Sequence, residues 1–181
     1  HIADVTHYVK PESLIDREAE SRATSVYLVD RTIPMLPERL CNQICSLRPD
    51  EEKLCFSAIF ELDEEANVKK SRVGRTVIKS DRRFTYEEAQ LVIETGEGDY
   101  KDEILVLDAL AKKLREKRFK NGAVNFDRFE VRFEIDETGK PISTYIKESK
   151  DANKLIEEFM LLANRTVAEF VGKVPKGKTK K

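Results

Sequence analysis

The chain has 181 residues, of which 37% are charged and 40% hydrophobic, and its 33 basic and 34 acidic residues leave a net charge of −1. This length fits one domain or part of a larger one, and no apolar run approaches the roughly 20 residues that a membrane-spanning helix needs. The balanced charge excludes a globally basic nucleic-acid-binding protein, so any RNA site has to be local.

Cysteine and histidine usage gives little sign of a reactive or metal centre. Cys41, Cys45 and Cys55 are an odd number, which excludes a secreted disulfide framework. The first two are four residues apart, which makes a weak zinc pattern, and we favour buried small hydrophobes. His1 and His7 lack a nucleophile in their motifs, so we expect structural or solvated roles. Without a visible signal peptide, the reduced cysteines favour the cytoplasm.

The first part of the chain alternates short strands with a charged helix. Residues 2–5 are predicted to be a strand end and residues 13–23 a surface helix. Residues 24–29 are rich in Thr, Val and Tyr, which fit a pleated strand. Pro34 and Pro37 then hold the chain extended and remove ladder donors. From spacing alone, a strand followed by a rigid loop over the core explains this stretch.

A predicted hairpin follows, with strands over residues 54–62 and 68–80 and a turn over 63–67. Its second strand and the residues after it carry seven basic side chains within fifteen residues: Lys69, Lys70, Arg72, Arg75, Lys79, Arg82 and Arg83. A solvated face is the default interpretation, and a strip that meets phosphates stays open as the alternative.

Two helices are predicted next. Thr85 and Glu88 form a capping box that starts a helix reaching about residue 94. The second helix covers residues 102–120 and ends before Gly122, a C-terminal cap position. Its last turns are strongly basic, which suits the negative end of the helix dipole. We prefer that account to RNA binding.

The last elements are a second hairpin and a long helix. Residues 129–135 alternate apolar and charged side chains, which predicts a strand with one buried and one wet face, and residues 142–147 return beside it. A helix over residues 151–171 follows, and residues 174–181 are predicted to be a basic flexible linker. The core side of this helix is predicted to carry Leu155, Ile156, Phe159, Ala163, Val167 and Phe170. The fold class is therefore mixed α and β (α+β), with antiparallel hairpins packed with helices.

Several short motifs occur in one order at tight spacing. They are Ile2-Ala3-Asp4-Val5, Asp16-Arg17-Glu18-Ala19, Ser25-Val26-Tyr27, Ile33-Pro34-Met35-Leu36-Pro37 and Cys45-Ser46-Leu47. This arrangement resembles the catalytic-domain signature of the ribonuclease R / ribonuclease II family of 3′→5′ exoribonucleases. The resemblance is specific over residues 1–49 and looser to about residue 172, with another close island at 153–164. It implies a fragment of a ribonuclease II-type catalytic domain, over residues 1–173, from a bacterial ribonuclease R.

The resemblance implies a processive enzyme that hydrolyses single-stranded RNA from its 3′ end to nucleoside 5′-monophosphates. Mg²⁺ held by clustered aspartates would carry the hydrolysis. This sequence has no Asp-Asp pair and no Asp-x-Asp, so the family's aspartate motif is expected upstream of His1 and its arginine motif beyond Lys181. We therefore expect no catalytic and no metal-binding residue in this chain, and an inactive fragment of a truncated or trimmed protein. The parent enzyme is expected to be monomeric, without a membrane or a small-molecule cofactor.

Three positions match RNA-binding residues of the family. Tyr27 matches an aromatic that stacks on RNA near its 3′ end, and Phe126 matches a second aromatic clamp through a shorter motif. Glu157 matches an acid that accepts from ribose 2′-hydroxyls, which distinguish RNA from DNA. Without the resemblance, both aromatics would be assigned to the core and Glu157 to the helix surface.

Other residues of the matched segments have weaker assignments. Asp4 and Asp16 also lie in the matched segment. Asp4 is at a strand end and could pass for a metal ligand, but we interpret it as structural or as a neighbour of the metal ligands that are expected upstream. Arg22 and Arg48 are candidate phosphate contacts. A non-catalytic RNA-binding or scaffolding module derived from the same fold is the alternative function, and accidental similarity is the remaining option.

Overall fold

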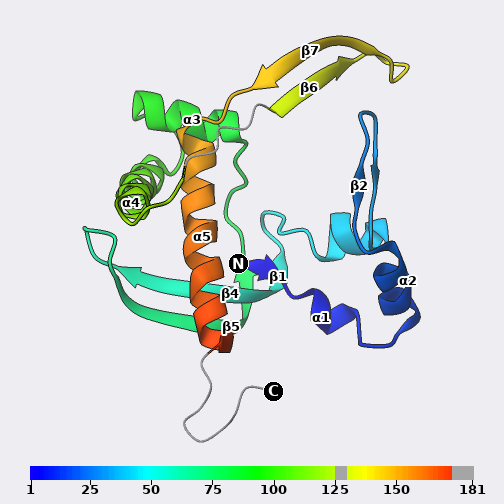
Figure 1. Cartoon of the computed structure of the whole chain (residues 1–181), viewed down its shortest axis with the longest axis horizontal. Helices are drawn as coiled ribbons and strands as arrows, with labels where there is room; N and C mark the ends of the chain where they lie inside the picture. Colours follow the sequence, from blue (N-terminus) through cyan, green and yellow to red (C-terminus); the bar gives the residue numbers. More distant parts are fainter. Residues whose placement is uncertain (125–129, 173–181) are drawn as a thin grey trace, which may run out of the picture. The chain divides into compact units, whose positions relative to one another are not determined.

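The structure, a computed structural model, describes residues 1–124 and 130–172 (Figure 1). It has mixed helices and hairpins, as the fold class predicted. The described residues divide into two compact units, and each is treated by itself. The first comprises residues 1–57, 75–83 and 130–148, and the second comprises residues 58–74, 84–124 and 149–172.

The three-stranded sheet has the order β1-β4-β5. β1 (Ile2–Ala3) pairs antiparallel with β4 (Glu52–Leu62), placing Ile2 opposite Phe56 and Ala3 opposite Cys55. β4 continues through a turn into β5 (Val68–Lys79), which confirms the first predicted hairpin. Cys55 is fully buried, as predicted, whereas Cys41 and Cys45 are only half-buried; all three are unbridged.

Short elements surround β1 in the first unit. The N-terminal strand is shorter than predicted, because α1 (Val5–Tyr8) begins immediately after Asp4. α2 (Leu14–Arg22) confirms the predicted surface helix, and the Ser13 hydroxyl accepts from the Asp16 backbone N–H at its start. The strand predicted over residues 24–29 is reduced to β2 (Val26–Tyr27).

β2 pairs antiparallel with β3 (Thr32–Ile33), so the loop predicted after β2 begins as a two-stranded ribbon. A π-helical turn, η1 (Arg39–Ile44), follows and holds Cys41 in its middle, with Cys45 directly after it. Pro34 and Pro37 therefore lie between the ribbon and the π-helical turn, where the backbone needs no N–H to donate to a neighbouring strand.

Asp4 anchors the first unit through buried polar contacts. Only 5% of its surface is exposed. Its carboxylate accepts from the Thr6 hydroxyl at 2.5 Å and pairs with the Arg75 guanidinium at 3.0 Å. Its backbone N–H donates to the Leu54 carbonyl. These contacts bind the end of β1 to β4 and β5, which agrees with a structural role for Asp4.

The second unit contains three helices that pack against one another: α3 (Tyr86–Thr95), α4 (Lys101–Lys120) and α5 (Asp151–Gly172). The capping box of Thr85 and Glu88 is present with both of its hydrogen bonds. α3 is capped at its C-terminal end by Gly96, which has a φ of +70°. Residues with a side chain rarely adopt this left-handed conformation, so glycine suits the position.

Buried Gln90 joins α3 to the start of α5. Its side-chain carbonyl accepts from the Ala152 N–H at 3.0 Å, and its amide donates to Glu94 at 2.8 Å. A buried polar side chain needs such partners. One orphan donor of α5 is thereby satisfied, which fixes where the helix begins.

The predicted core side of α5 is partly wrong. Leu155 is buried, but Ile156 and Phe170 are exposed, while Ala152 and the charged Glu158 are buried instead. Hydrophobic periodicity cannot anticipate a buried acid, because the burial of Glu158 depends on a counter-charge from another helix.

The second hairpin consists of β6 (Glu130–Ile135) and β7 (Pro141–Lys147), paired antiparallel with Val131 opposite Ile146 and Phe133 opposite Thr144. The strands confirm the alternation, but the prediction of a buried face is wrong. Val131, Phe133, Ile142 and Ile146 are all exposed.

In both described ranges, none of the helices combines the length and hydropathy needed to span a membrane.

We predict that Asp4→Asn destabilises the protein at neutral pH. The Thr6 hydroxyl and the Arg75 guanidinium hold the pKa of Asp4 below its ordinary value of 3.8. A carboxyl with a lowered folded-state pKa contributes stability above its unfolded-state pKa and loses it as pH falls. The difference in unfolding free energy between wild type and variant should therefore narrow below about pH 4.

Urea denaturation at a series of pH values checks this prediction. Asp50→Asn is the matched control, because the Asp50 side chain is exposed and lies 3.9 Å from Lys79. It should change the unfolding free energy by less than about 0.5 kcal/mol. A destabilisation by Asp4→Asn that stays constant between pH 7 and pH 3 would contradict the assignment.

Candidate functional site

Tyr27 lies on the two-stranded ribbon of the first unit. It is opposite Thr32, and the Leu28 N–H donates to the Arg31 carbonyl to close the ribbon. The side chain of Ser25 also accepts from the Met35 N–H, which ties the base of the ribbon together. Tyr27 is 79% exposed. The interpretation as a core aromatic is therefore wrong, and the ring is available to a partner.

The surface around Tyr27 is apolar as well as exposed. Its ribbon neighbours Val26, Leu28, Val29 and Ile33 are all exposed. A local apolar surface of this kind, carried on a ribbon closed by backbone hydrogen bonds, can accept the face of a flat ring.

Glu157 lies on α5 in the second unit with 52% of its side chain exposed. Its Oε1 accepts from Arg118 Nη2 at 3.3 Å. The next residue, Glu158, is 3% exposed and accepts three hydrogen bonds from the same guanidinium, at 2.6, 3.1 and 3.1 Å. One Arg of α4 therefore holds two consecutive acids of α5.

The two carboxylates set the electrostatics of Arg118, mainly through the hydrogen bonds to Glu158. The carboxylate of Glu158 and, to a lesser degree, that of Glu157 raise the pKa of Arg118. Arg118 also lies over the Phe119 ring, 5.0 Å from its centroid. A charged fork with bidentate geometry and an aromatic beneath it has little freedom to reorient.

A cavity of about 440 Å³ adjoins this pair in the second unit. Its lining combines an apolar floor with basic and amide side chains: Leu114, Lys117, Arg118, Asn121, Gly122, Ala123, Glu158, Leu161, Leu162 and Arg165. Gly122 and Ala123 come just before the segment that contains Phe126. Phe126 itself lies outside the described residues.

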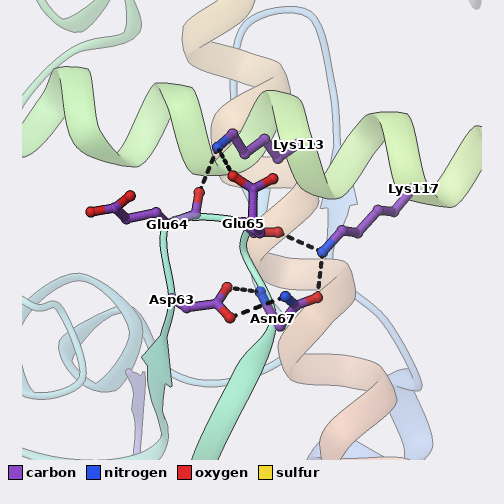
Figure 2. A network of polar contacts seen from close by, with 6 residues as sticks. All are labelled: Asp63, Glu64, Glu65, Asn67, Lys113 and Lys117. Atoms are coloured by element: carbon purple, nitrogen blue, oxygen red, sulfur yellow. Dashed lines mark hydrogen bonds and ion pairs between the residues drawn. The ribbon is translucent and has the colours of Figure 1, made fainter.

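The basic residues near the end of α4 hold the β4–β5 turn. Figure 2 shows Lys113 and Lys117 pointing from α4 toward this turn. Lys113 Nζ donates to the Glu64 carbonyl at 2.6 Å and to the Glu65 carboxylate at 3.0 Å. Lys117 Nζ donates to Asn67 Oδ1 at 2.6 Å. These contacts agree with the preference against RNA binding by this helix end and add a packing role that the dipole argument missed.

The basic strip of β5 is partly neutralised. Lys69 pairs with Asp63 at 2.8 Å, and Arg75 pairs with Asp4. The Lys69 ammonium and hydrogen bonds from Asn67 hold the pKa of Asp63 well below its usual range. These contacts favour the solvated-face interpretation over a continuous phosphate-binding strip.

The other sequence-based candidates have local partners. Arg22 pairs with Glu18 at 2.8 Å and donates to the Pro34 carbonyl, and Arg48 donates to the Asn42 carbonyl at 2.7 Å. His1 shares a hydrogen bond of 2.6 Å with Ser57. Each of these side chains therefore has a protein partner, and none of these contacts requires a bound phosphate.

The described residues do not fit a Mg²⁺ site. Within residues 1–124 and 130–172, no three His, Cys, Asp or Glu side chains gather as metal ligands would. Divalent-metal chemistry on phosphates needs clustered carboxylates.

Residues 1–177 match the family described as the RNB domain. The chain belongs to this family. The resemblance to ribonuclease R and ribonuclease II proteins is thereby confirmed, and Tyr27 and Glu157 both lie inside the matched RNB domain.

Relatives of this RNB domain are named as exonucleases and as ribonuclease R. The chain is 48% identical to "DIS3-like exonuclease 2" of Schizosaccharomyces pombe, covering 96% of the chain and 20% of that protein. It is 39% identical to "Ribonuclease R 2" of Lactococcus lactis, covering 93% of the chain and 27% of that protein. It therefore spans about a fifth to a quarter of these relatives, and both bacteria and eukaryotes contribute relatives.

Solved structures share the fold. Mycoplasma genitalium RNase R, in complex with ribose-methylated single-stranded RNA, is 30% identical, with a TM-score of 0.87 over 94% of this chain and 27% of its own. Yeast Ssd1, described as a pseudonuclease, is 20% identical, with a TM-score of 0.71 over 92% of this chain and 20% of its own. The second likeness concerns the fold alone.

Sequence reasoning missed Arg118 and Glu158 in this RNB domain. Arg118 was grouped with the basic end of α4, and Glu158 was not singled out beside Glu157. The spacing alone does not single out either residue, because the burial of Glu158 depends on Arg118 of another helix.

We predict that Glu158→Gln destabilises the protein by roughly 2–3 kcal/mol. Breaking a buried ion pair costs about 3–5 kcal/mol, and we reduce that range because the Arg118 side chain keeps 28% exposure. Denaturant unfolding measures the change. Glu116→Gln, which removes an exposed ion pair between Glu116 and Lys120 of α4, should leave the unfolding free energy almost unchanged, because an exposed ion pair contributes little to stability. Equal effects of the two substitutions would contradict the assignment.

Proposed function

We propose that the protein containing this chain is a processive 3′→5′ exoribonuclease that hydrolyses single-stranded RNA to nucleoside 5′-monophosphates. In this proposal the chain supplies part of the grip on the RNA 3′ end. The observation that carries it is the 79% exposed ring of Tyr27 on a ribbon of an RNB domain. The proposal draws on relatives named as exoribonucleases.

Tyr27 would hold RNA by stacking. Every base has a flat face, so an exposed ring binds RNA without sequence preference, and each stacked base contributes about 1–3 kcal/mol. An enzyme that removes nucleotides one by one needs such tolerance, because every sequence must pass the same contact. Phe126 would be the second clamp, and it lies outside the described residues.

Glu157 would accept from a ribose 2′-hydroxyl. A carboxylate has about four lone-pair sites, and the described bond from Arg118 uses Oε1 at 3.3 Å. This leaves capacity for a further donor at the half-exposed side chain. DNA lacks the 2′-hydroxyl donor, so the contact would favour RNA.

Mg²⁺, held by aspartates in other segments, would stabilise charge at the scissile phosphate. The residues of this chain would bind and orient RNA, and the hydrolytic step would not use them. We further propose a cytoplasmic, monomeric parent enzyme that needs no small-molecule cofactor. Residues 1–173 would be part of its catalytic domain; the predicted basic linker, residues 174–181, lies outside the described residues.

A non-catalytic RNA-binding or scaffolding module is the second candidate. A fold likeness to a pseudonuclease favours it, because the RNB fold does not by itself require hydrolysis. The two candidates make the same prediction for RNA binding by Tyr27 and opposite predictions for nuclease activity of the whole protein.

We predict that Tyr27→Ala in the whole protein weakens RNA binding by about 1–3 kcal/mol and lengthens the end products, because a stacking platform is lost. Tyr27→Phe keeps the ring and should behave like the wild type. Fluorescence anisotropy with a labelled single-stranded RNA and gel analysis of end products measure both effects. If Tyr27→Ala binds and degrades RNA normally, the stacking role is wrong.

We predict that the 181-residue chain alone lacks nuclease activity, because its sequence has no Asp-Asp pair and no Asp-x-Asp. A purified sample would be incubated with single-stranded RNA and Mg²⁺, with an EDTA control. Nucleoside monophosphates released only in the presence of Mg²⁺ would refute the prediction. Binding of RNA without hydrolysis by the whole protein would favour the second candidate.

A further inference from the structure

We propose that Arg118 is a positioning residue that fixes the Glu157 carboxylate for its contact with a ribose 2′-hydroxyl. This inference rests on the proposed function, because it needs Glu157 to bind ribose. Arg118 would not touch RNA itself. Its effect would pass through the carboxylate that it holds.

The first step of the argument is the contact between the two residues. Arg118 Nη2 lies 3.3 Å from Glu157 Oε1, and 52% of the Glu157 side chain is exposed. An exposed Glu side chain has considerable rotamer freedom, which binding must remove. A fixed donor on the neighbouring helix removes part of that freedom before RNA arrives.

The second step is that Arg118 is itself fixed. Glu158, 3% exposed, accepts from both Nε and Nη2 of Arg118 in a bidentate arrangement. The guanidinium lies over the ring of Phe119, and the distance from Arg118 Cζ to the ring centroid is 5.0 Å. The planar fork is thus held by a buried acid and a ring, and Nη2 reaches Glu157 from a defined position.

The third step assigns different tasks to the two consecutive acids. Glu158 is buried and occupied by the fork, so it cannot meet a substrate hydroxyl. Glu157 has one long hydrogen bond and an exposed side chain. The pair therefore separates into an acid that anchors Arg118 and an acid that Arg118 orients.

Arg118→Lys should break the contacts with Glu157 and Glu158 while keeping the positive charge. An ammonium is a point charge without the planar fork, so it cannot reproduce the bidentate bond to Glu158 while reaching Glu157. Arg115→Lys is the matched control. Arg115 lies on the same helix over the same ring, 5.3 Å from its centroid, and the described contacts between α4 and Glu157 come from Arg118.

The experiment uses the whole protein and a single-stranded RNA in which one 2′-hydroxyl at a time is replaced by hydrogen. Binding is measured in EDTA by fluorescence anisotropy, so that hydrolysis does not interfere. When the 2′-hydroxyl that Glu157 contacts is replaced by hydrogen, we expect the wild type to bind the RNA about tenfold more weakly. A loss of this size is typical of one hydrogen bond to a charged group. Glu157→Ala and Arg118→Lys should both bind the unmodified RNA more weakly and lose sensitivity to that one position.

Two further variants guard against a folding defect. The double substitution Arg118→Gln with Glu158→Gln removes both charges together, so no buried charge is left unpaired. It should show the same position-specific loss as Arg118→Lys. Combining Arg118→Lys with Glu157→Ala should lower RNA affinity no further than Glu157→Ala alone, because Arg118 acts through Glu157.

The outcomes separate this inference from the function on which it rests. If Arg118→Lys weakens binding equally for every modified RNA, or has no effect, its role is only structural and the inference is overturned. If Glu157→Ala alone loses position-specific sensitivity, the ribose contact stands and only the positioning role fails. If Glu157→Ala keeps full sensitivity, both the ribose contact and the inference are wrong.

Discussion

The ion pair between Arg118 and buried Glu158 is the constraint on which the helical unit depends. An acid with 3% exposure can stay charged only with a close counter-charge, and Arg118 meets that need with three hydrogen bonds. The pair therefore holds α4 and α5 in one arrangement. Gln90, which links α3 to the start of α5, completes the packing, so that Glu157 projects from a helix fixed at two points.

The two RNA contacts that we propose rest on different physical supports. Tyr27 belongs to a ribbon of two-residue strands and has an exposed ring with apolar neighbours, which suits stacking on any base. Glu157 belongs to a long helix and is oriented by a guanidinium, which suits recognition of one hydroxyl. In this proposal, tolerance of base sequence and selectivity for ribose belong to separate elements.

The sequence was sufficient for most of the elements and for the family. The capping box at Thr85, the hairpin strands and the long helices follow from local rules, and the structure confirms them. It was insufficient where non-local partners decide. The burial of Glu158 and the role of the lysines that hold the β4–β5 turn depend on contacts with distant residues, and alternation alone does not reveal that the apolar face of β6–β7 is exposed. The exposure of Tyr27 could not be predicted from its residue type, because aromatic side chains are usually well buried. Only the resemblance to the family proposed a role for it on the surface.

Photo-crosslinking from the RNA 3′ end tests the central claim most directly. The whole protein, in EDTA, would be irradiated with single-stranded RNAs that carry one 4-thiouridine at successive positions, and crosslinked peptides would be identified by mass spectrometry. The account predicts crosslinks to the β2–β3 ribbon around Tyr27 from positions near the 3′ end and not from the 5′ end. Crosslinks that miss this ribbon at every position would contradict it.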